Sequence, residues 1–289
     1  MSSEHFKYPV FGQVDYFKYN NVASQLASHT PSPSHSQELG AKKRTVDPIV
    51  TGTSVIAIKY NGGVVMGADT LLSYGSLARF NNIERMKKFG KSTIIGAGGE
   101  YSDFQNLSQV LDDLVVDDGC TDDGTTLSTT EIWNYIARVM YNRRNKGDPY
   151  WNSLVVIGHD NNKSFLGKVD LVGTCYQDNF IASGYGSHIA LPLLRKAYKE
   201  DMTLDEAKTL IQDCLRVLFY RDARSSRFIQ LSIANADGLV ITEQIALDTD
   251  KWDSGDSAKK KKNQDGRKKK NNYRNDSTQV ILEYGHNVV

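Results

Sequence analysis

The sequence predicts an α+β protein, a four-layer αββα sandwich in which two β-sheets pack face to face and a pair of helices covers each sheet. Its elements are expected in the order strands, two helices, strands, two helices, strands. The central strands are apolar on both faces, and such strands need cover on both sides of their sheet. Because the helices come in pairs, one pair outside each sheet is the simplest way to bury all of these faces.

The first elements are two strands joined by a tight turn. Residues 53–60 and 63–70 are rich in β-branched and apolar side chains, which favours strands. Asn61-Gly62 lies between them, and this dipeptide tolerates the positive φ angles of a two-residue hairpin turn. A third short strand is expected over residues 92–99.

The first helix pair is predicted to follow that strand. Residues 102–118 have apolar side chains at helical spacing, with Ser102 or Asp103 as the expected N-cap. Residues 129–147 form the second predicted helix, with Pro149 behind it as a stop signal. The predicted core positions of the pair are Phe104, Leu107, Leu111, Leu114, Ile132, Ile136, Val139 and Met140.

The second half of the chain supplies two more predicted hairpins. Residues 152–160 and 165–176 are the strands of one, and residues 228–235 and 239–247 are the strands of the other. Short polar or glycine-containing turns separate the two strands in each case. Together with the first strands, these segments form the two predicted sheets.

The second helix pair lies between those two hairpins. Residues 188–201 predict a helix in which Pro192 must lie in the first turn or kink the helix, because proline removes a hydrogen bond from a helix interior. Thr203 and Glu206 have the spacing of a capping box in front of a helix over residues 207–222.

Composition excludes several classes of function. The formal net charge of +1 gives no general attraction to nucleic acid or to anionic membranes. The three cysteines have no C-x-x-C spacing, so neither a disulfide framework nor a zinc cluster is expected. No apolar run is long enough to span a bilayer and no secretory leader is evident, which indicates a soluble, non-secreted protein. No cofactor and no metal ion are expected.

Two flanking segments differ from the predicted domain in composition. Residues 1–44 contain a Ser/Pro-rich stretch and end in the basic step "AKKR", so they are predicted to be a disordered leader or a removable propeptide. Residues 253–289 hold a Lys-rich insert at 254–275 and an apolar tip, "TQVILEYGHNVV". The insert is interpreted as a solvated loop; a nucleic-acid role is a weaker alternative because no aromatic side chains are interleaved among the lysines. The domain itself is expected over residues 45–252.

Four short motifs carry a resemblance to a known family. They are "TGTSVIAIKYNGGVVMGADT", "IIGAGGEYSD", "SGYGSH" and "YRDARSS", in this order over about two hundred residues. The chain resembles the β subunits of the proteasome core particle, which are N-terminal-nucleophile hydrolases with an αββα sandwich. Within that family, "YGSLARFNNIERM", "VMYNRRNKGDPYWNSLVV" and "FYRDARSSRF" are most similar to the non-catalytic subunits at the seventh position of the eukaryotic β ring.

The resemblance implies a site around Thr53. In active β subunits a cut between Gly and Thr frees an α-amino group that acts as general base for the threonine hydroxyl. Thr53 matches the nucleophile, Asp69 the acidic member of the site, and Asp222 and Ser225 the supporting pair. An amine suits this role because its pKa is about 8, whereas an amide nitrogen has no such basicity.

Two positions depart from the active pattern. Arg85 stands where the family has its essential lysine, and a guanidinium stays charged instead of exchanging protons. Tyr185 stands at the position of a family serine and is expected to crowd the site. The resemblance also places the propeptide junction at Arg44/Thr45, which would leave residues 45–52 in front of Thr53.

Three hypotheses follow. The first is a non-catalytic structural subunit that supports ATP- and ubiquitin-dependent protein degradation. It would assemble with other β and α subunits in stacked rings and reach the opposite β ring with its C-terminal arm. Its expected location is the cytoplasm and the nucleus. The second is an active N-terminal threonine endopeptidase. The third, nucleic-acid binding through the Lys-rich insert, is the weakest. In a purely structural interpretation, Thr53 is a β-forming residue, and Asp69 and Asp222 are ion-pair partners of Arg85 or Arg221.

Overall fold

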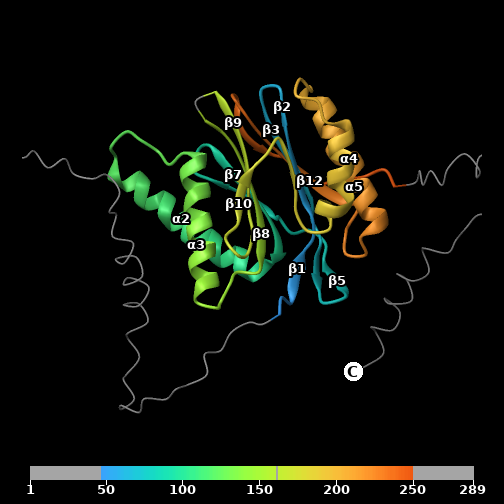
Figure 1. Ribbon diagram of the computed structural model, residues 1–289, viewed down its shortest axis with the longest axis horizontal. Coiled ribbons are helices and arrows are strands. Elements are labelled where there is room, and N and C mark those ends of the chain that lie inside the picture. The colour runs from blue at the N-terminus through green and yellow to red at the C-terminus, as the bar shows by residue number, and fades with distance from the viewer. Residues whose placement is uncertain (1–46, 161, 250–289) are drawn as a thin grey trace, which may run out of the picture. The chain divides into compact units, whose positions relative to one another are not determined.

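A computed structural model describes residues 47–160 and 162–249 of the chain (Figure 1). The predicted leader 1–44, the junction Arg44/Thr45, the insert 254–275 and the C-terminal arm lie outside the described residues, so these assignments stay predictions.

The first sheet has eight strands, all paired in antiparallel fashion. Their order is β10-β9-β8-β7-β1-β4-β5, and β6 pairs with β7 in addition. The strands are β1 (Val50–Gly52), β4 (Leu72–Tyr74), β5 (Leu77–Phe80), β6 (Met86–Phe89), β7 (Thr93–Glu100), β8 (Asn152–Asp160), β9 (Lys163–Val169) and β10 (Cys175–Gln177).

The second sheet has six antiparallel strands in the order β11-β2-β3-β12-β13, with β14 also paired to β12. The strands are β2 (Val55–Tyr60), β3 (Gly63–Asp69), β11 (Phe180–Ala182), β12 (Phe228–Asn235), β13 (Gly238–Ile241) and β14 (Ile245–Ala246). The helices are α2 (Tyr101–Thr121), α3 (Thr129–Asn145), α4 (Gly186–Ala197) and α5 (Leu204–Arg221).

Three buried apolar clusters join these elements into four layers. Side chains of α2 and α3 pack on the outer face of the eight-stranded sheet, as Leu107 does beside Val156 in one cluster. Side chains of α4 and α5 cover the six-stranded sheet, with Ile211 and Leu231 in the second cluster. The third cluster, which includes Met66, fills the space between the two sheets. Figure 1 shows α2 and α3 on one side of the sheets and α4 and α5 on the other, so the predicted α+β sandwich is confirmed.

Local turn and cap signals in the sequence correspond to real features. Gly62 has a φ of +104° in the turn between β2 and β3, a conformation that glycine adopts without strain. Thr203 and Glu206 form the predicted capping box, with both reciprocal hydrogen bonds present. A second capping box, Ser128 with Glu131 at the start of α3, has the same sequence signature but was not predicted.

Several predicted boundaries are wrong. The strand expected from Thr53 begins at Val55. α2 follows β7 directly, with Glu100 in the N-cap position in place of Ser102 or Asp103. Asp103 instead accepts a hydrogen bond from the backbone of a distant loop residue in front of β8. Pro192 is in the interior of α4, because that helix begins two residues before the predicted start, at Gly186.

Five strands have no counterpart in the predicted elements: β1, β4, β5, β6 and β11. β1 is only three residues long, and β5 is exposed along its whole length, so neither shows the alternation that predicts a strand.

Two further findings concern the described part of the chain. Cys120 and Cys175 are exposed, whereas Cys214 is buried in α5, and its burial raises the pKa of its thiol to about 12. No helix within residues 47–160 and 162–249 is long and apolar enough to cross a membrane.

Candidate functional site

Thr53 lies where the chain crosses from one sheet to the other. β1 belongs to the eight-stranded sheet and ends at Gly52, while β2 begins in the six-stranded sheet at Val55. β1 is paired on both sides, with Gly52 opposite Leu72 of β4 and opposite Gly99 of β7. β1 is therefore an embedded strand that ends immediately in front of Thr53.

A buried carboxylate holds the start of β1. Glu100 is 5 % exposed, and its Oε2 accepts hydrogen bonds from the backbone N–H groups of Ile49 (2.5 Å) and Val50 (3.0 Å). Its Oε1 accepts a hydrogen bond from the Ser102 hydroxyl at 2.9 Å. Sequence reasoning missed Glu100, because an acid at a strand-to-helix junction has no local feature that points to a strand 50 residues away.

Arg85 lies next to Thr53 with its guanidinium fully enclosed. Nη2 donates to Oδ1 of Asp69 at 2.7 Å and to the carbonyl of Ser54 at 2.8 Å. Nη1 donates to the carbonyl of Thr53 at 3.0 Å, and Nε donates to the carbonyl of Asp69 at 2.8 Å. A Cβ on Gly52 would lie 2.6 Å from Nη1, so glycine is needed there for the arginine to fit.

Asp69 is the centre of the charged cluster, at the end of β3. Its Oδ1 accepts the Thr53 hydroxyl at 3.3 Å, longer than a typical O–H···O bond, and its Oδ2 accepts the Ser226 N–H at 3.0 Å. Burial raises the pKa of Asp69 above its ordinary value, while the charge of Arg85 and the two hydrogen bonds act in the opposite direction. Burial shifts the pKa of Arg85 in the other direction, below its ordinary value, but a guanidinium paired with a carboxylate remains protonated.

Asp222 and Ser225 lie close to this cluster but do not reach Thr53. Asp222 is the C-cap of α5, and its Oδ1 accepts the backbone N–H of Arg224 at 3.0 Å. Ser225 donates its N–H to the carbonyl of Asp222 at 3.2 Å. Within the described residues, no hydrogen bond joins either side chain to Thr53, and the link runs through Ser226 and Asp69.

Tyr185 is the N-cap residue of α4 and is 62 % exposed. The prediction that it crowds the site is not supported by that exposure. The turn that carries it does pack on the site, because the N–H of Gly186 donates to the Ser54 hydroxyl at 2.8 Å. Ser183, in the same turn, accepts the N–H of Val55 at 2.9 Å.

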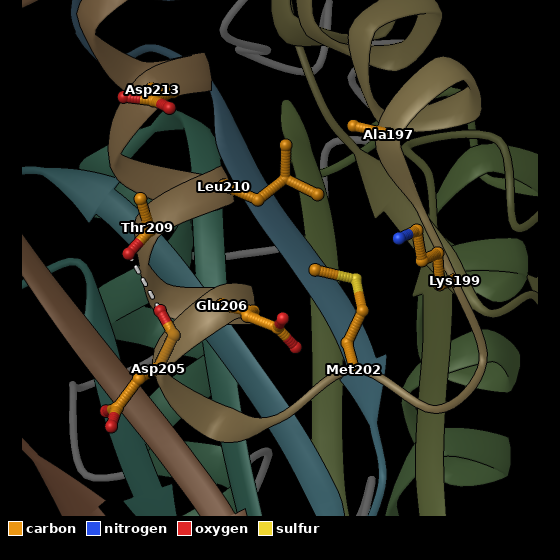
Figure 2. A pocket seen from close by; sticks show the side chains of 8 residues that line it. All are labelled: Ala197, Lys199, Met202, Asp205, Glu206, Thr209, Leu210 and Asp213. Carbon is orange, nitrogen blue, oxygen red and sulfur yellow. Dashed lines mark hydrogen bonds between the residues drawn. The ribbon is translucent and has the colours of Figure 1, made fainter.

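A surface pocket lies away from this cluster. It has a volume of about 450 Å³ and lies between the end of α4 and the start of α5, with Met202 and Leu210 as its main apolar lining (Figure 2). All three of its acidic side chains already have partners: Glu206 caps α5 through Thr203, while Asp205 pairs with a lysine and Asp213 with an arginine of the same helix. Within the described residues, no cluster of His, Cys, Asp and Glu side chains is arranged to hold a metal ion.

Among the described residues, Asp69 accepts the Thr53 hydroxyl and Arg85 is the cation beside it. While Gly52 is attached, the nitrogen of Thr53 is an amide without basicity, and the guanidinium of Arg85 does not exchange its proton near neutral pH. The structure thus brings Thr53, Asp69 and Arg85 together and places Asp222 and Ser225 one step away.

Comparison with known proteins identifies the family. The sequence model of the proteasome subunit family matches residues 49–234. The chain is 63 % identical over 262 residues to proteasome subunit beta type-4 of Dictyostelium discoideum. The matched region covers 90 % of this chain and 98 % of that protein. It is 44 % identical over 207 residues to proteasome subunit beta type-4 of Arabidopsis thaliana, a match that covers 72 % of this chain and 84 % of that protein. It is 42 % identical over 246 residues to proteasome subunit beta type-7 of Saccharomyces cerevisiae, a match that covers 81 % of this chain and 90 % of that protein. The chain belongs to the proteasome subunit family.

Proposed function

We propose that this chain is a non-catalytic β subunit of the proteasome core particle. Its function is structural: it supports assembly of the β rings and hence the ATP- and ubiquitin-dependent protein degradation that the particle performs. The observation that carries this proposal is β1, which is paired with β4 and β7 immediately in front of Thr53. The names of the curated relatives, proteasome subunits beta type-4 and type-7, support it.

The chemistry of the site supports the proposed inactivity, provided that Gly52 stays attached to Thr53. An N-terminal threonine needs its own free amine, with a pKa of about 8, as the general base. Here the nitrogen of Thr53 is joined to Gly52, and releasing it would require cutting a peptide bond at the end of a paired strand. Removal of β1 would also leave the facing edges of β4 and β7 without a partner. The sandwich is proposed to be of the N-terminal-nucleophile hydrolase type, on the resemblance and the position of Thr53.

The alternative is an active N-terminal threonine endopeptidase. The hydrogen bond from the Thr53 hydroxyl to Asp69, at 3.3 Å, favours it because the acidic partner is in place. A peptide epoxyketone reacts with a threonine hydroxyl together with its adjacent free amine, so it distinguishes the two functions. In purified core particles we expect the probe to label other β subunits and to leave this chain unlabelled. Labelling of Thr53 would establish the alternative.

The proposal also covers the subunits that this chain contacts and the compartments in which it resides. We propose ring neighbours of the β type, a contact with an α subunit, and residence in cytoplasm and nucleus. The C-terminal arm is proposed to reach the opposite β ring by adding a strand or filling a groove.

Truncation after Trp252 is expected to slow or block the joining of two half-particles, because it removes the arm that would bridge the rings. Native gels of assembly intermediates measure this. A chain that lacks residues 254–275 but keeps the arm is the matched control and separates the arm from the Lys-rich insert. Unchanged assembly of the truncated chain would refute the role of the arm.

A further inference from the structure

We propose that Glu100 is a positioning residue that clamps the segment in front of Thr53 into the eight-stranded sheet. The clamp keeps residues 49–52 in place and so keeps the edges of β4 and β7 beside Thr53 closed to other peptides. This inference rests on the proposed function in one respect, because the segment must still be attached to the mature chain.

The geometry of the two hydrogen bonds shows how Glu100 acts. Successive N–H groups of an extended strand point to opposite sides, yet those of Ile49 and Val50 both donate to Oε2 of Glu100. Two adjacent N–H groups that converge on one anion form a bend in the chain. Glu100 therefore both anchors β1 and fixes the point at which the chain turns into the sheet, immediately behind Pro48.

β1 needs such an anchor because it is short. A three-residue strand makes few ladder hydrogen bonds, and its partners β4 and β7 contribute only the residues opposite Val50–Gly52. Hydrogen bonds to a carboxylate are roughly twice as strong as those between neutral groups. The carboxylate of Glu100 thus adds two strong bonds at the end of β1 where the ladder alone is weakest.

Glu100 is itself held rigidly. Its backbone N–H donates to the carbonyl of Trp151 at 2.8 Å, and its carbonyl accepts the side-chain amide of Asn152 at 2.7 Å. The Ser102 hydroxyl fixes the second carboxylate oxygen. The acceptor is therefore preorganised, so little side-chain freedom is lost when the segment binds.

A helix-terminal role is the competing explanation. Glu100 occupies the N-cap position of α2, where a negative charge is favourable for the helix dipole. Its side chain, however, makes no capping hydrogen bond to the backbone of that helix. Both of its carboxylate oxygens are used elsewhere: Oε1 accepts from the Ser102 hydroxyl, and Oε2 accepts from the two residues at the start of β1.

Three substitutions separate the clamp from the helix-dipole role. Glu100→Ala removes both the acceptor for Ile49 and Val50 and the negative charge at the start of α2. Glu100→Asp keeps the charge at the helix end but withdraws the carboxylate from Ile49 and Val50, while Glu100→Gln removes the charge but keeps an oxygen that can accept. Glu243→Ala, at an exposed glutamate between β13 and β14, is the matched control.

Hydrogen exchange measured by mass spectrometry on purified core particles tests the proposal. Peptides that cover residues 47–54 report the amides of Ile49 and Val50, without a contribution from Pro48, which has no N–H. We expect these amides to exchange about tenfold faster or more in Glu100→Ala and Glu100→Asp. Glu100→Gln should lie between these variants and the wild type, because a neutral oxygen accepts weaker hydrogen bonds, and Glu243→Ala should match the wild-type rate. Peptides from β2 and β8 are expected to be unchanged.

Other outcomes contradict the clamp. Wild-type exchange in Glu100→Asp, with fast exchange in Glu100→Gln, would assign Glu100 to the helix dipole. Equal acceleration in all peptides would assign it to general stability. If Glu100→Ala does not assemble, Glu100→Asp and Glu100→Gln still give the decisive contrast. The intact mass of the wild-type chain, measured in the same samples, shows whether residues 49–52 are present. Their absence overturns the proposed function. Their presence, with unchanged exchange in Glu100→Ala and Glu100→Asp, overturns the clamp alone.

Discussion

Replacing Arg85 with methionine is expected to lower the free energy of unfolding by about 3–5 kcal/mol, the usual cost of leaving one partner of a buried ion pair without its counter-charge. Asp69 would keep its carboxylate in a site where its side chain is 1 % exposed. The carbonyls of Thr53 and Ser54 would also lose their donors. Arg85→Lys is expected to cost less, because an ammonium keeps the charge but cannot reach all four acceptors.

The loss caused by Arg85→Met is expected to depend on pH. Burial already raises the folded-state pKa of Asp69 above its ordinary value, and removal of the arginine charge raises it further. An acid whose pKa is higher in the folded state binds more protons there, so stability falls as pH rises from the unfolded-state value through the folded one. The deficit relative to the wild type should therefore be smallest under acidic conditions and grow toward neutral pH.

Urea unfolding of the full-length chain at several pH values, followed by tryptophan fluorescence, measures both effects. Arg138→Met is the matched control, since Arg138 is an exposed residue of α3 and should change stability by no more than about 0.5 kcal/mol. The double variant Arg85→Met with Asp69→Asn should lose less than the sum of the two single losses. Additive losses would mean that the two side chains are not coupled.

Gly99→Ala is expected to destabilise the chain by roughly 2–5 kcal/mol, from about 1–2 kcal/mol of backbone strain and about 1–3 kcal/mol of overpacking. Gly99 has a φ of +91°, and a Cβ there would lie 2.0 Å from the carbonyl oxygen of Trp151. That contact is with backbone, so β7 or the loop before β8 must move. Because Gly99 is paired with Gly52 and precedes Glu100, the displacement would also disturb β1.

Two other glycines serve as controls for this prediction. Gly75 has a φ of +59° but open space where an added Cβ would lie, so Gly75→Ala isolates the backbone strain. Gly119 is in α2, also with open space, and Gly119→Ala should stabilise the chain by about 0.5–1 kcal/mol because alanine favours helices. Thermal unfolding of the three variants measures the differences. A Gly99→Ala loss no larger than that of Gly75→Ala would contradict the steric argument.

Local chemistry explains which parts of the fold could be predicted from the sequence. The turn at Asn61-Gly62 and the capping box of Thr203 depend on residues near each other in the chain, so the sequence alone identifies them. Long apolar strands and amphipathic helices likewise indicate their layers. Of the two alternatives for Pro192, the first turn is ruled out, because the helix begins at Gly186 and packs on the six-stranded sheet, where tertiary contacts outweigh the local preference of proline.

The site was predictable only in part for the same reason. The resemblance identified Thr53, Asp69 and Arg85, but nothing near Arg85 in the sequence indicates that its guanidinium would be enclosed by three backbone carbonyls and a carboxylate. β1 has three residues and no periodicity, and its formation depends on β4, β7 and Glu100, which lie about 20 to 50 residues away. Such long-range contacts have no local signature.

The N-terminal residue of the chain in purified core particles, determined by N-terminal sequencing and intact mass, decides most directly whether Thr53 has a free amine. We expect a start upstream of Ile49, at Thr45, so that β1 remains in the sheet and Thr53 has no free amine. A mature chain that starts at Thr53 would contradict it.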